Sequence, residues 1–297
     1  MKILTILTFV FLAVELRASS LLTLLKPAPF RFSYSYTPQS KVEANDFSAS
    51  IKLKQNEINL EGVFGKIDHT ENSFLILGIR NHIEHFQMSG EVPTVMKKEM
   101  FLYQTDIPMT YISVSDKWMQ ILRVAPGIYT DYRNVVDTDD LDAAISYMAT
   151  YNNDKKLKWI LGIGHNRYLG DSITFPLLGF KYQPSESILI GAVLPYIYAS
   201  YAYDHQNLLQ FSLTPSGNKW NVNRDVDGVT NKSFDVSYRS LKAGVSYERM
   251  NEKLLSLRME IGRMLFREFR YLHTKSSRSF ISIENSNYFD LSLNKRF

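Results

Sequence analysis

The amino-acid sequence predicts an all-β protein, a closed antiparallel up-and-down transmembrane β-barrel of about 12 strands. Three observations lead to this class: an apolar N-terminus of signal-peptide length, alternation of apolar and polar residues along most of the remaining chain, and a final strand that ends in an aromatic residue. Alternation is the period of a β-strand, whose successive side chains point to opposite faces. The predicted organisation is a signal peptide over residues 1–20 and one barrel domain over residues 21–297.

Composition excludes several other classes. The chain has 297 residues, of which 45% are hydrophobic and 13% aromatic, and this is too apolar for intrinsic disorder. A net charge of +4 without a run of Lys and Arg does not indicate the basic surface that binds DNA or RNA, so nucleic acid is not an expected partner. Cysteine is absent, which excludes disulfides, thiolate metal sites and cysteine nucleophiles.

The N-terminus has the layout of a secretory signal peptide. Lys2 supplies a short positive region, residues 3–14 form the apolar stretch, and Ala18 and Ser20 are small residues placed for cleavage. A short buried helix is the alternative. No later segment is typical of a membrane-spanning helix, because the best candidate, residues 187–203, has Pro195 in its middle. We therefore expect export through a cleaved signal peptide.

Alternation after residue 21 predicts the strands. It is clearest in residues 30–36, 47–53, 241–247 and 289–297, where large apolar side chains alternate with small, polar or charged ones. A membrane barrel requires this pattern, because lipid contacts one face and a polar interior lies behind the other. The sheet must also close, because an open edge in hydrocarbon leaves backbone groups without partners. We expect the apolar face of these strands to contact lipid.

Polar segments separate the alternating stretches. Residues 66–72, 152–155 and 183–187 have the composition of turns, and residues 216–233 are predicted to be a longer exposed loop that either stays outside or folds inward as a plug. Strands of about 9 to 11 residues suit a tilted membrane span. Bacterial barrels have an even number of strands, and we expect 12.

One segment fits two structures. Residues 253–272 alternate through Leu255, Leu257 and Met259 as a strand would, but the spacing of Leu257, Ile261 and Leu265 also fits an amphipathic helix. The strand is preferred, because Gly262 and the surrounding alternation favour it.

The last strand resembles the C-terminal targeting strand that the outer-membrane assembly machinery recognises. Apolar residues stand at Phe289, Leu291 and Leu293, and the chain stops at Phe297, while Lys295 departs from the usual pattern. The expected location is therefore the bacterial outer membrane. The expected partners are the assembly machinery, outer-membrane lipid and lipopolysaccharide, and we expect a monomer.

Three stretches in the middle of the chain resemble a known family. They are residues 118–131 (WMQILRVAPGIYTD), 161–165 (LGIGH) and 175–182 (FPLLGFKY), the last followed by Leu194 and Pro195. Their order and spacing resemble a family of bacterial outer-membrane β-barrels that carries only a domain-of-unknown-function name. The resemblance covers residues 30–297. It implies a closed barrel in a Gram-negative outer membrane and assigns no activity.

Charged residues on the polar faces are the candidate functional residues. If the alternation holds, a set of charges points into the lumen: Arg239, Lys242, Glu248, Arg258, Glu260, Asp290 and Arg296. Such residues either line a pore and set its ion preference or form a paired network that fills a narrow barrel. Both interpretations stay open at this point.

Other chemistry has weaker signals. The acidic residues 137–142 and the fragment 225–228 are interpreted as solvated turns rather than calcium sites, and the six histidines show no ligand spacing, so no metal or cofactor is expected. No G-x-S-x-G elbow is present. The preferred function is a narrow passive channel or a structural barrel, with no enzymatic activity. The alternatives are an outer-membrane enzyme acting on lipid or lipopolysaccharide and a soluble periplasmic carrier.

Overall fold

The computed structural model describes residues 29–43, 51–90, 92, 98–132, 136–152, 156–167, 169–226, 229–274 and 277–295. The predicted signal peptide, Arg296 and Phe297 lie outside these ranges. Within them the chain is nearly all strand, with one short 3-10 turn, η1 (Thr138–Asp140). No helix in these ranges has both the length and the apolar character needed to cross a bilayer.

The strands form a single sheet. In chain order they are β1 (Phe30–Glu43), β2 (Ile51–Thr70), β3 (Ser73–Ser89), β4 (Glu99–Asp106), β5 (Met109–Val114), β6 (Trp118–Thr130), β7 (Leu141–Asn152), β8 (Leu157–Asn166), β9 (Ile173–Ser185), β10 (Ile188–Val193), β11 (Tyr196–Ala202), β12 (Asn207–Val226), β13 (Val229–Met250), β14 (Leu255–Thr274), β15 (Ser277–Ile283) and β16 (Ser286–Lys295).

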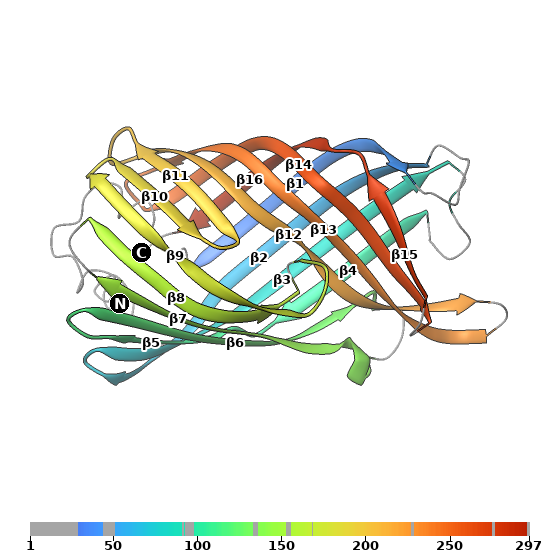
Figure 1. Cartoon of the computed structure of the whole chain (residues 1–297), viewed down its shortest axis with the longest axis horizontal. Helices are drawn as coiled ribbons and strands as arrows, with labels where there is room; N and C mark the ends of the chain where they lie inside the picture. Colours follow the sequence, from blue (N-terminus) through green and yellow to red (C-terminus); the bar gives the residue numbers. More distant parts are fainter. Residues whose placement is uncertain are drawn as a thin grey trace.

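The sheet closes on itself as an antiparallel barrel (Figure 1). Except for β4 with β5 and β15 with β16, successive strands pair with each other, and β1 pairs with β2 on one side and with β15 and β16 on the other. Two places in the ring are shared: β4 and β5 both lie between β3 and β6, and β15 and β16 both lie between β14 and β1. The 16 strands therefore occupy 14 positions.

The predicted count of 12 strands is wrong. Several connections are only two residues long, such as 71–72 between β2 and β3 and 194–195 between β10 and β11. Such short connections leave little polar sequence between one alternating run and the next, so neighbouring strands are hard to separate by pattern. Leu194 and Pro195 form the turn that connects β10 with β11.

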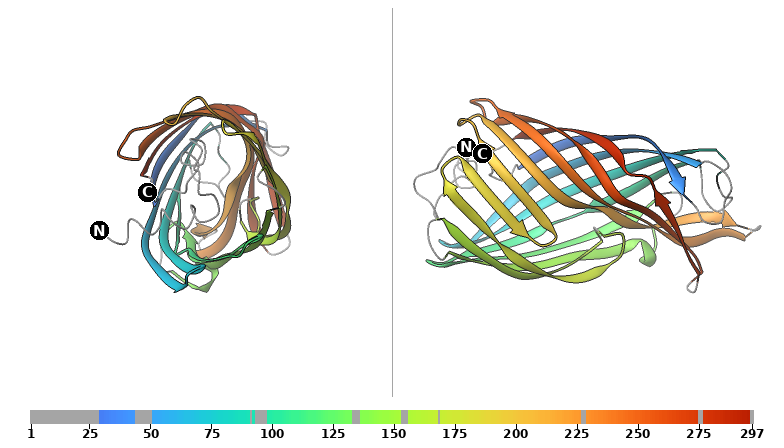
Figure 2. Two further views of the ribbon diagram at one scale, coloured as in Figure 1. Left: turned by 90° about the vertical axis from the view of Figure 1, so that its left-hand side faces the viewer. Right: turned by 45° about the horizontal axis from the view of Figure 1, so that its top comes forward.

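The two ends of the barrel differ. At the turn side, short connections join the strands, and Phe30 pairs with Lys295, so both described chain ends lie there (Figure 2). At the loop side the connections include the longer segments 90–98 and 131–140. There β12 continues after Leu213, the last of its residues that pairs with β11. Farther along, it meets β6 in a parallel contact between Asn221 and Thr130. The loop-side end is consequently closed by fewer strands.

The described part of residues 216–233, namely 216–226 and 229–233, is not a loop, so that prediction is wrong. It belongs to the loop-side halves of β12 and β13, which pair continuously from Ser216 with Ser240 to Asn223 with Ser233. Trp220 and Val222 are buried inside the barrel rather than exposed to lipid. This part of β12 therefore lacks the outward apolar residues by which the other strands are recognised.

The ambiguous segment 253–272 is a strand, as preferred. The register of β13 against β14 shifts between Arg239 and Leu241, at a bulge near Phe266, whose φ of 51° is left-handed. An extra residue in one strand reverses which side chains point inward. Met264 and Phe269 are therefore both buried, although they are five residues apart. Leu257, Ile261 and Leu265 precede this bulge, and their helix-like spacing arises because residues four apart share one face of a strand as they do in a helix.

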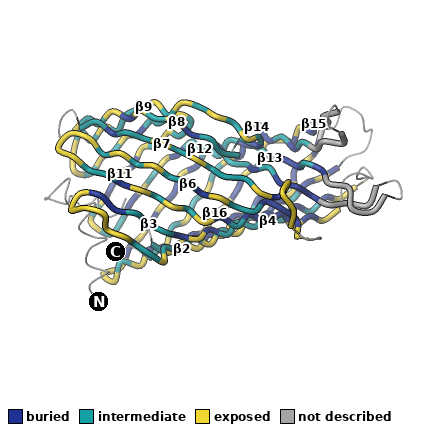
Figure 3. The backbone as a smooth tube through the Cα atoms, turned by 90° about the horizontal axis from the view of Figure 1, so that it is seen from below, coloured by how far each residue is buried: buried dark blue, intermediate teal, exposed yellow. Residues whose placement is uncertain are grey.

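An apolar core fills the loop-side end of the barrel. Its members come from β1 to β4, β6 and β12 to β16, and none is more than 9% exposed. They are Val42, Ile51, Leu53, Phe86, Met88, Met100, Leu102, Tyr129, Trp220, Val222, Val236, Tyr238, Met264, Phe269, Ile281, Ile283 and Tyr288. In Figure 3, buried residues are concentrated around β4 and β13.

Ile51 and Leu53 belong to this core, which corrects the expectation that the apolar face of residues 47–53 contacts lipid. Ile51 is 1% exposed and Leu53 is 0% exposed. Farther along β2 the pattern reverses, because Ile58 and Leu60 are exposed on the outer face. Residues 47–50 lie outside the described ranges.

Candidate functional site

The outer face of the barrel carries a belt of exposed apolar side chains. Leu257, Met259 and Ile261 on β14 are 42 to 65% exposed, and equivalent residues stand on β8 and β12. Phe289, Leu291 and Leu293 of the predicted C-terminal assembly strand belong to the belt and are 37 to 39% exposed on β16. Exposed large apolar residues covering a closed sheet need an apolar surrounding.

Aromatic side chains border this belt on the turn side. The rings of Trp118 and Tyr151 pack with centroids 4.8 Å apart, and Trp159 lies near them on β8, with its ring 6.2 Å from that of Phe180. Tyr203, in the turn between β11 and β12, is 77% exposed. Amphipathic rings at this level are typical of the boundary between hydrocarbon and headgroups.

Inside the barrel, on the turn side of the apolar core, lies a polar cavity of about 570 Å³. Strands β1 to β4, β11 to β14 and β16 supply its walls. Its charged lining contains the cations Arg31, Arg80, Lys242 and Arg258, the carboxylates Glu57, Glu61, Glu84, Glu260 and Asp290, and His82. The volume is in the range of small-molecule sites, and the near balance of charge suits a polar occupant of low net charge.

One group of these charges joins opposite walls of the cavity. Lys242 Nζ on β13 donates to Glu57 Oε2 on β2 over 2.7 Å. His82 lies between two carboxylates, with Nε2 3.0 Å from Glu84 Oε1 and Nδ1 3.7 Å from Glu57 Oε1. Gln55 Nε2 donates to Glu84 Oε2 over 3.1 Å. The network links β2, β3 and β13 through hydrogen-bonded charges.

A second group holds the wall at β3, β4 and β12. Arg80 donates from Nε to Asp106 Oδ1 over 2.9 Å and from Nη2 to Asp106 Oδ2 over 2.6 Å. The Asp106 side chain is fully buried, and it also accepts a hydrogen bond from Gln104. Asn218 Nδ2 donates to Gln104 Oε1 over 2.5 Å. This contact ties the inward part of β12 to the far wall.

A third group lies on β14 and β16. Arg258 Nη2 donates to Glu260 Oε2 and the Tyr288 hydroxyl donates to Glu260 Oε1, both over 2.5 Å. Arg258 Nη1 also donates to Gln210 Oε1 on β12 over 3.3 Å. The ring of Tyr288 leaves no room for a side chain at Gly244, where an added Cβ would lie 2.3 Å from the tyrosine hydroxyl. The glycine therefore makes space for this network.

The structure brings together four of the predicted lumen residues. Lys242, Arg258, Glu260 and Asp290 line the cavity. Glu248 also faces inward, is 2% exposed and accepts a hydrogen bond from the Ser256 hydroxyl over 2.5 Å, but it lies outside the cavity lining. Arg296 falls outside the described residues.

Arg239 lies on the opposite face of β13 from Lys242, which corrects its placement in the lumen. Residues three apart on a regular strand point to opposite faces. Its Nη2 donates to Glu268 Oε2 over 2.5 Å, and Arg270 on the same face pairs with Asp171 over 2.6 Å. These ion pairs fasten the β8–β9 connection to the outside of the loop-side end.

Residues on β2 and β3 are the main part of the cavity that sequence reasoning missed. Glu57, Arg80 and His82 lie on strands whose inward face changes from apolar to polar along their length. The alternation of Glu57, Asn59 and Glu61 with Ile58 and Leu60 is a signal in the sequence for this face.

Asp137, Asp140 and His165 have local roles outside the cavity. Asp137 caps η1, and its backbone N–H donates to Asp140 Oδ2 over 3.0 Å. His165 Nδ1 is 2.9 Å from the Thr174 hydroxyl, away from the cavity. Within the described ranges no group of three or more His, Cys, Asp or Glu side chains is arranged to hold a metal ion.

A closed barrel with an apolar outer belt and a polar interior has the architecture of a membrane β-barrel. The chain belongs to the family described as "Domain of unknown function (DUF6268)", whose model matches residues 26–296. No curated protein matches the sequence.

Three solved structures are similar in outline. The COG4313 outer membrane channel from Pseudomonas putida F1 has 12% identity and a TM-score of 0.44, covering 91% of this chain and 96% of its own. The Pseudomonas putida toluene transporter TodX has 9% identity and a TM-score of 0.48, covering 96% and 93%. LpxR from Salmonella typhimurium has 8% identity and a TM-score of 0.35, covering 90% and 100%. At TM-scores of 0.48 or less, none of these likenesses assigns a solute or an activity.

Proposed function

We propose that the protein is a narrow passive channel of the bacterial outer membrane for small polar solutes, restricted at its loop side by the apolar core. The polar cavity of about 570 Å³ inside a closed barrel carries this proposal, because a barrel with only a structural role has no need of a polar space in its interior. The apolar belt supports a membrane location over a soluble periplasmic carrier, because lipid is the surrounding that such a belt requires.

The turn side faces the periplasm in this proposal. Bacterial barrels have short periplasmic turns and longer extracellular loops. The pairing of Phe30 with Lys295 puts both described ends of the chain on the turn side, and the longer connections lie at the other end. The apolar core then separates the cavity from the cell exterior.

Single-channel recording of the refolded, signal-free protein in a planar bilayer tests the proposal. We expect long closed periods and brief discrete current steps, because the apolar core must rearrange before ions pass. A folded protein that never conducts would favour a filled structural barrel. Release of acyl chains from labelled membranes by the purified protein would favour the enzyme alternative.

The cavity charges are expected to set the ion preference of these steps. Replacing Glu57 with glutamine removes the carboxylate that neutralises Lys242, so the permeability ratio of cations to anions should fall. Reversal potentials in a salt gradient measure this ratio. Glu186→Gln, an exposed residue in the β9–β10 turn, is the matched control and should leave the ratio unchanged. Equal shifts in both variants would mean that the cavity is not the conducting path.

A further inference from the structure

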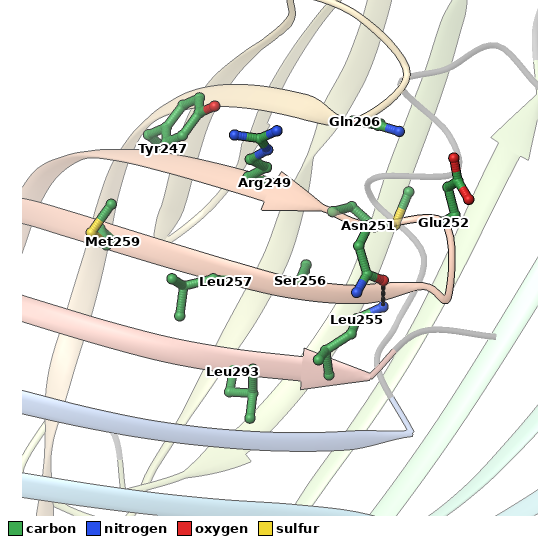
Figure 4. Close-up of a pocket in the computed structure, with 11 residues that line it drawn as sticks. Gln206, Tyr247, Arg249, Asn251, Glu252, Leu255, Ser256, Leu257, Met259 and Leu293 are labelled. Carbon is green, nitrogen blue, oxygen red and sulfur yellow. Dashed lines mark hydrogen bonds between the residues drawn. The ribbon is translucent and has the colours of Figure 1, made fainter.

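A second hollow lies on the outside of the barrel at the turn side. It has a volume of about 600 Å³ and surrounds the connection between β13 and β14, with one wall reaching to β16 (Figure 4). We call it the rim groove, and its lining consists of Gln206, Tyr247, Arg249, Met250, Asn251, Glu252, Leu255, Ser256, Leu257, Met259 and Leu293.

The rim groove has a polar end at the turn. Arg249 and Glu252 are both exposed, and neither side chain has a hydrogen bond or ion pair with any residue in the part of the chain that the structure describes. Asn251 lies between them in sequence, and its Oδ1 accepts the backbone N–H of Leu255 over 2.9 Å, which holds the turn in shape. The groove therefore presents one cation at the end of β13 and one anion on the ordered turn that follows it.

The other end of the rim groove is apolar. Leu257, Met259 and Leu293 are 37 to 44% exposed and belong to the belt on the outer face. In Figure 4 these side chains lie along the strands, away from the turn that carries Asn251 and Glu252. The groove thus runs from two opposite charges that are not paired with each other to a surface that faces hydrocarbon in the proposed membrane setting.

Two neighbouring charged side chains at this rim, those of Asp204 and Lys295, already have hydrogen-bond partners. Asp204 Oδ1 accepts the backbone N–H groups of Gln206 and Asn207, each over 2.8 Å. Hydrogen bonds from the Gln206 backbone and the Asn207 side chain hold the pKa of the Asp204 carboxyl below its usual range. Lys295 Nζ donates to the carbonyl oxygen of Lys253 over 2.5 Å. Arg249 and Glu252 remain as the charges of the groove itself.

We propose that the rim groove binds a glycerophospholipid with an amine headgroup. The lipid phosphate contacts the Arg249 guanidinium, the headgroup ammonium contacts the Glu252 carboxylate, and an acyl chain lies along Leu257 and Met259. Charge-assisted hydrogen bonds of this kind are stronger than neutral ones, and a guanidinium matches the geometry of phosphate. The proposal rests on the membrane location given above but not on conduction.

Native mass spectrometry of the full signal-free protein in detergent tests this binding, with phosphatidylethanolamine, phosphatidylglycerol and phosphatidylcholine added separately. Phosphatidylethanolamine should be retained best, because only it offers both a phosphate and an ammonium N–H donor. Arg249→Gln and Glu252→Gln should each weaken its retention about tenfold, as expected for losing one charged hydrogen-bonding partner. Glu252→Gln should leave retention of phosphatidylglycerol unchanged.

Arg263→Gln is the matched control. Arg263 is an exposed arginine on the same outward face of β14 but outside the rim groove, so its replacement should not change retention. Equal retention of the three lipids, or a loss in Arg263→Gln as large as in Arg249→Gln, would overturn the proposal. Folding of every variant is checked by the difference in gel migration before and after boiling. A wild-type protein without this difference would contradict the membrane barrel itself, which is a separate failure.

Discussion

Replacing Trp220 with alanine is expected to open the loop-side end of the barrel and to lower the free energy of unfolding by about 3–5 kcal/mol. Trp220 is fully buried on the inward part of β12, within the apolar core to which β1 to β4, β6 and β12 to β16 contribute. A void of about 10 Å³ in this core, lined by Val42, Leu53 and Phe269 among others, is at the lower limit of the space that one water molecule needs. Removing the indole leaves a cavity in the layer that separates the polar lumen from the loops.

Planar-bilayer recording and urea unfolding in detergent measure the two effects. Trp220→Ala should spend more time open than the wild type and should unfold at lower urea. Trp220→Phe keeps an aromatic ring and removes an indole N–H that has no hydrogen-bond partner in the described structure, so it should remain largely closed. Trp118→Ala, at an exposed tryptophan on the outer face, is the second control and should not change the current. Unchanged current in folded Trp220→Ala would show that the apolar core is not the barrier.

Replacing Arg80 with methionine is expected to lower the free energy of unfolding by about 3–5 kcal/mol, because Asp106 is then buried without its cation. The Asp106 side chain is fully buried and that of Arg80 is 10% exposed. The pair also orders Gln104, which receives the hydrogen bond from Asn218 on β12. The variant should therefore loosen the contact between the inward hairpin and the wall as well.

Urea unfolding of the same variants in detergent gives the comparison. Arg80→Met combined with Asp106→Leu should recover most of the lost stability, because no unpaired charge remains. Lys219→Met removes one member of a partly exposed pair, in which Lys219 and Asp235 are 25% and 38% exposed, and should cost only about 0–1 kcal/mol. A similar loss in Arg80→Met and Lys219→Met would mean that burial of the first pair has no energetic consequence.

Alternation in the sequence identifies part of the charged lining of the lumen. Lys242, Arg258, Glu260 and Asp290 were recognisable because they alternate with lipid-facing residues on regular strands. Arg239 was misplaced because it stands three residues from Lys242, so both cannot share a face. The partner of Lys242 is Glu57, which is 185 residues away, and no local pattern pairs them.

The sequence by itself determined the all-β class, the strand predicted within residues 253–272 and the apolar strand 289–293, because side-chain alternation is a local property with a period of two. Only the tertiary structure decided the number of strands, the inward course of β12 and the apolar core at the loop side. The physical reason is that the apolar face of a strand points outward where it contacts lipid and inward where it contacts other side chains. Ile58 and Leu60 are exposed on β2, whereas Ile51 and Leu53 on the same strand are buried. Alternation reports that two faces differ, but closure of the barrel decides which face is inside.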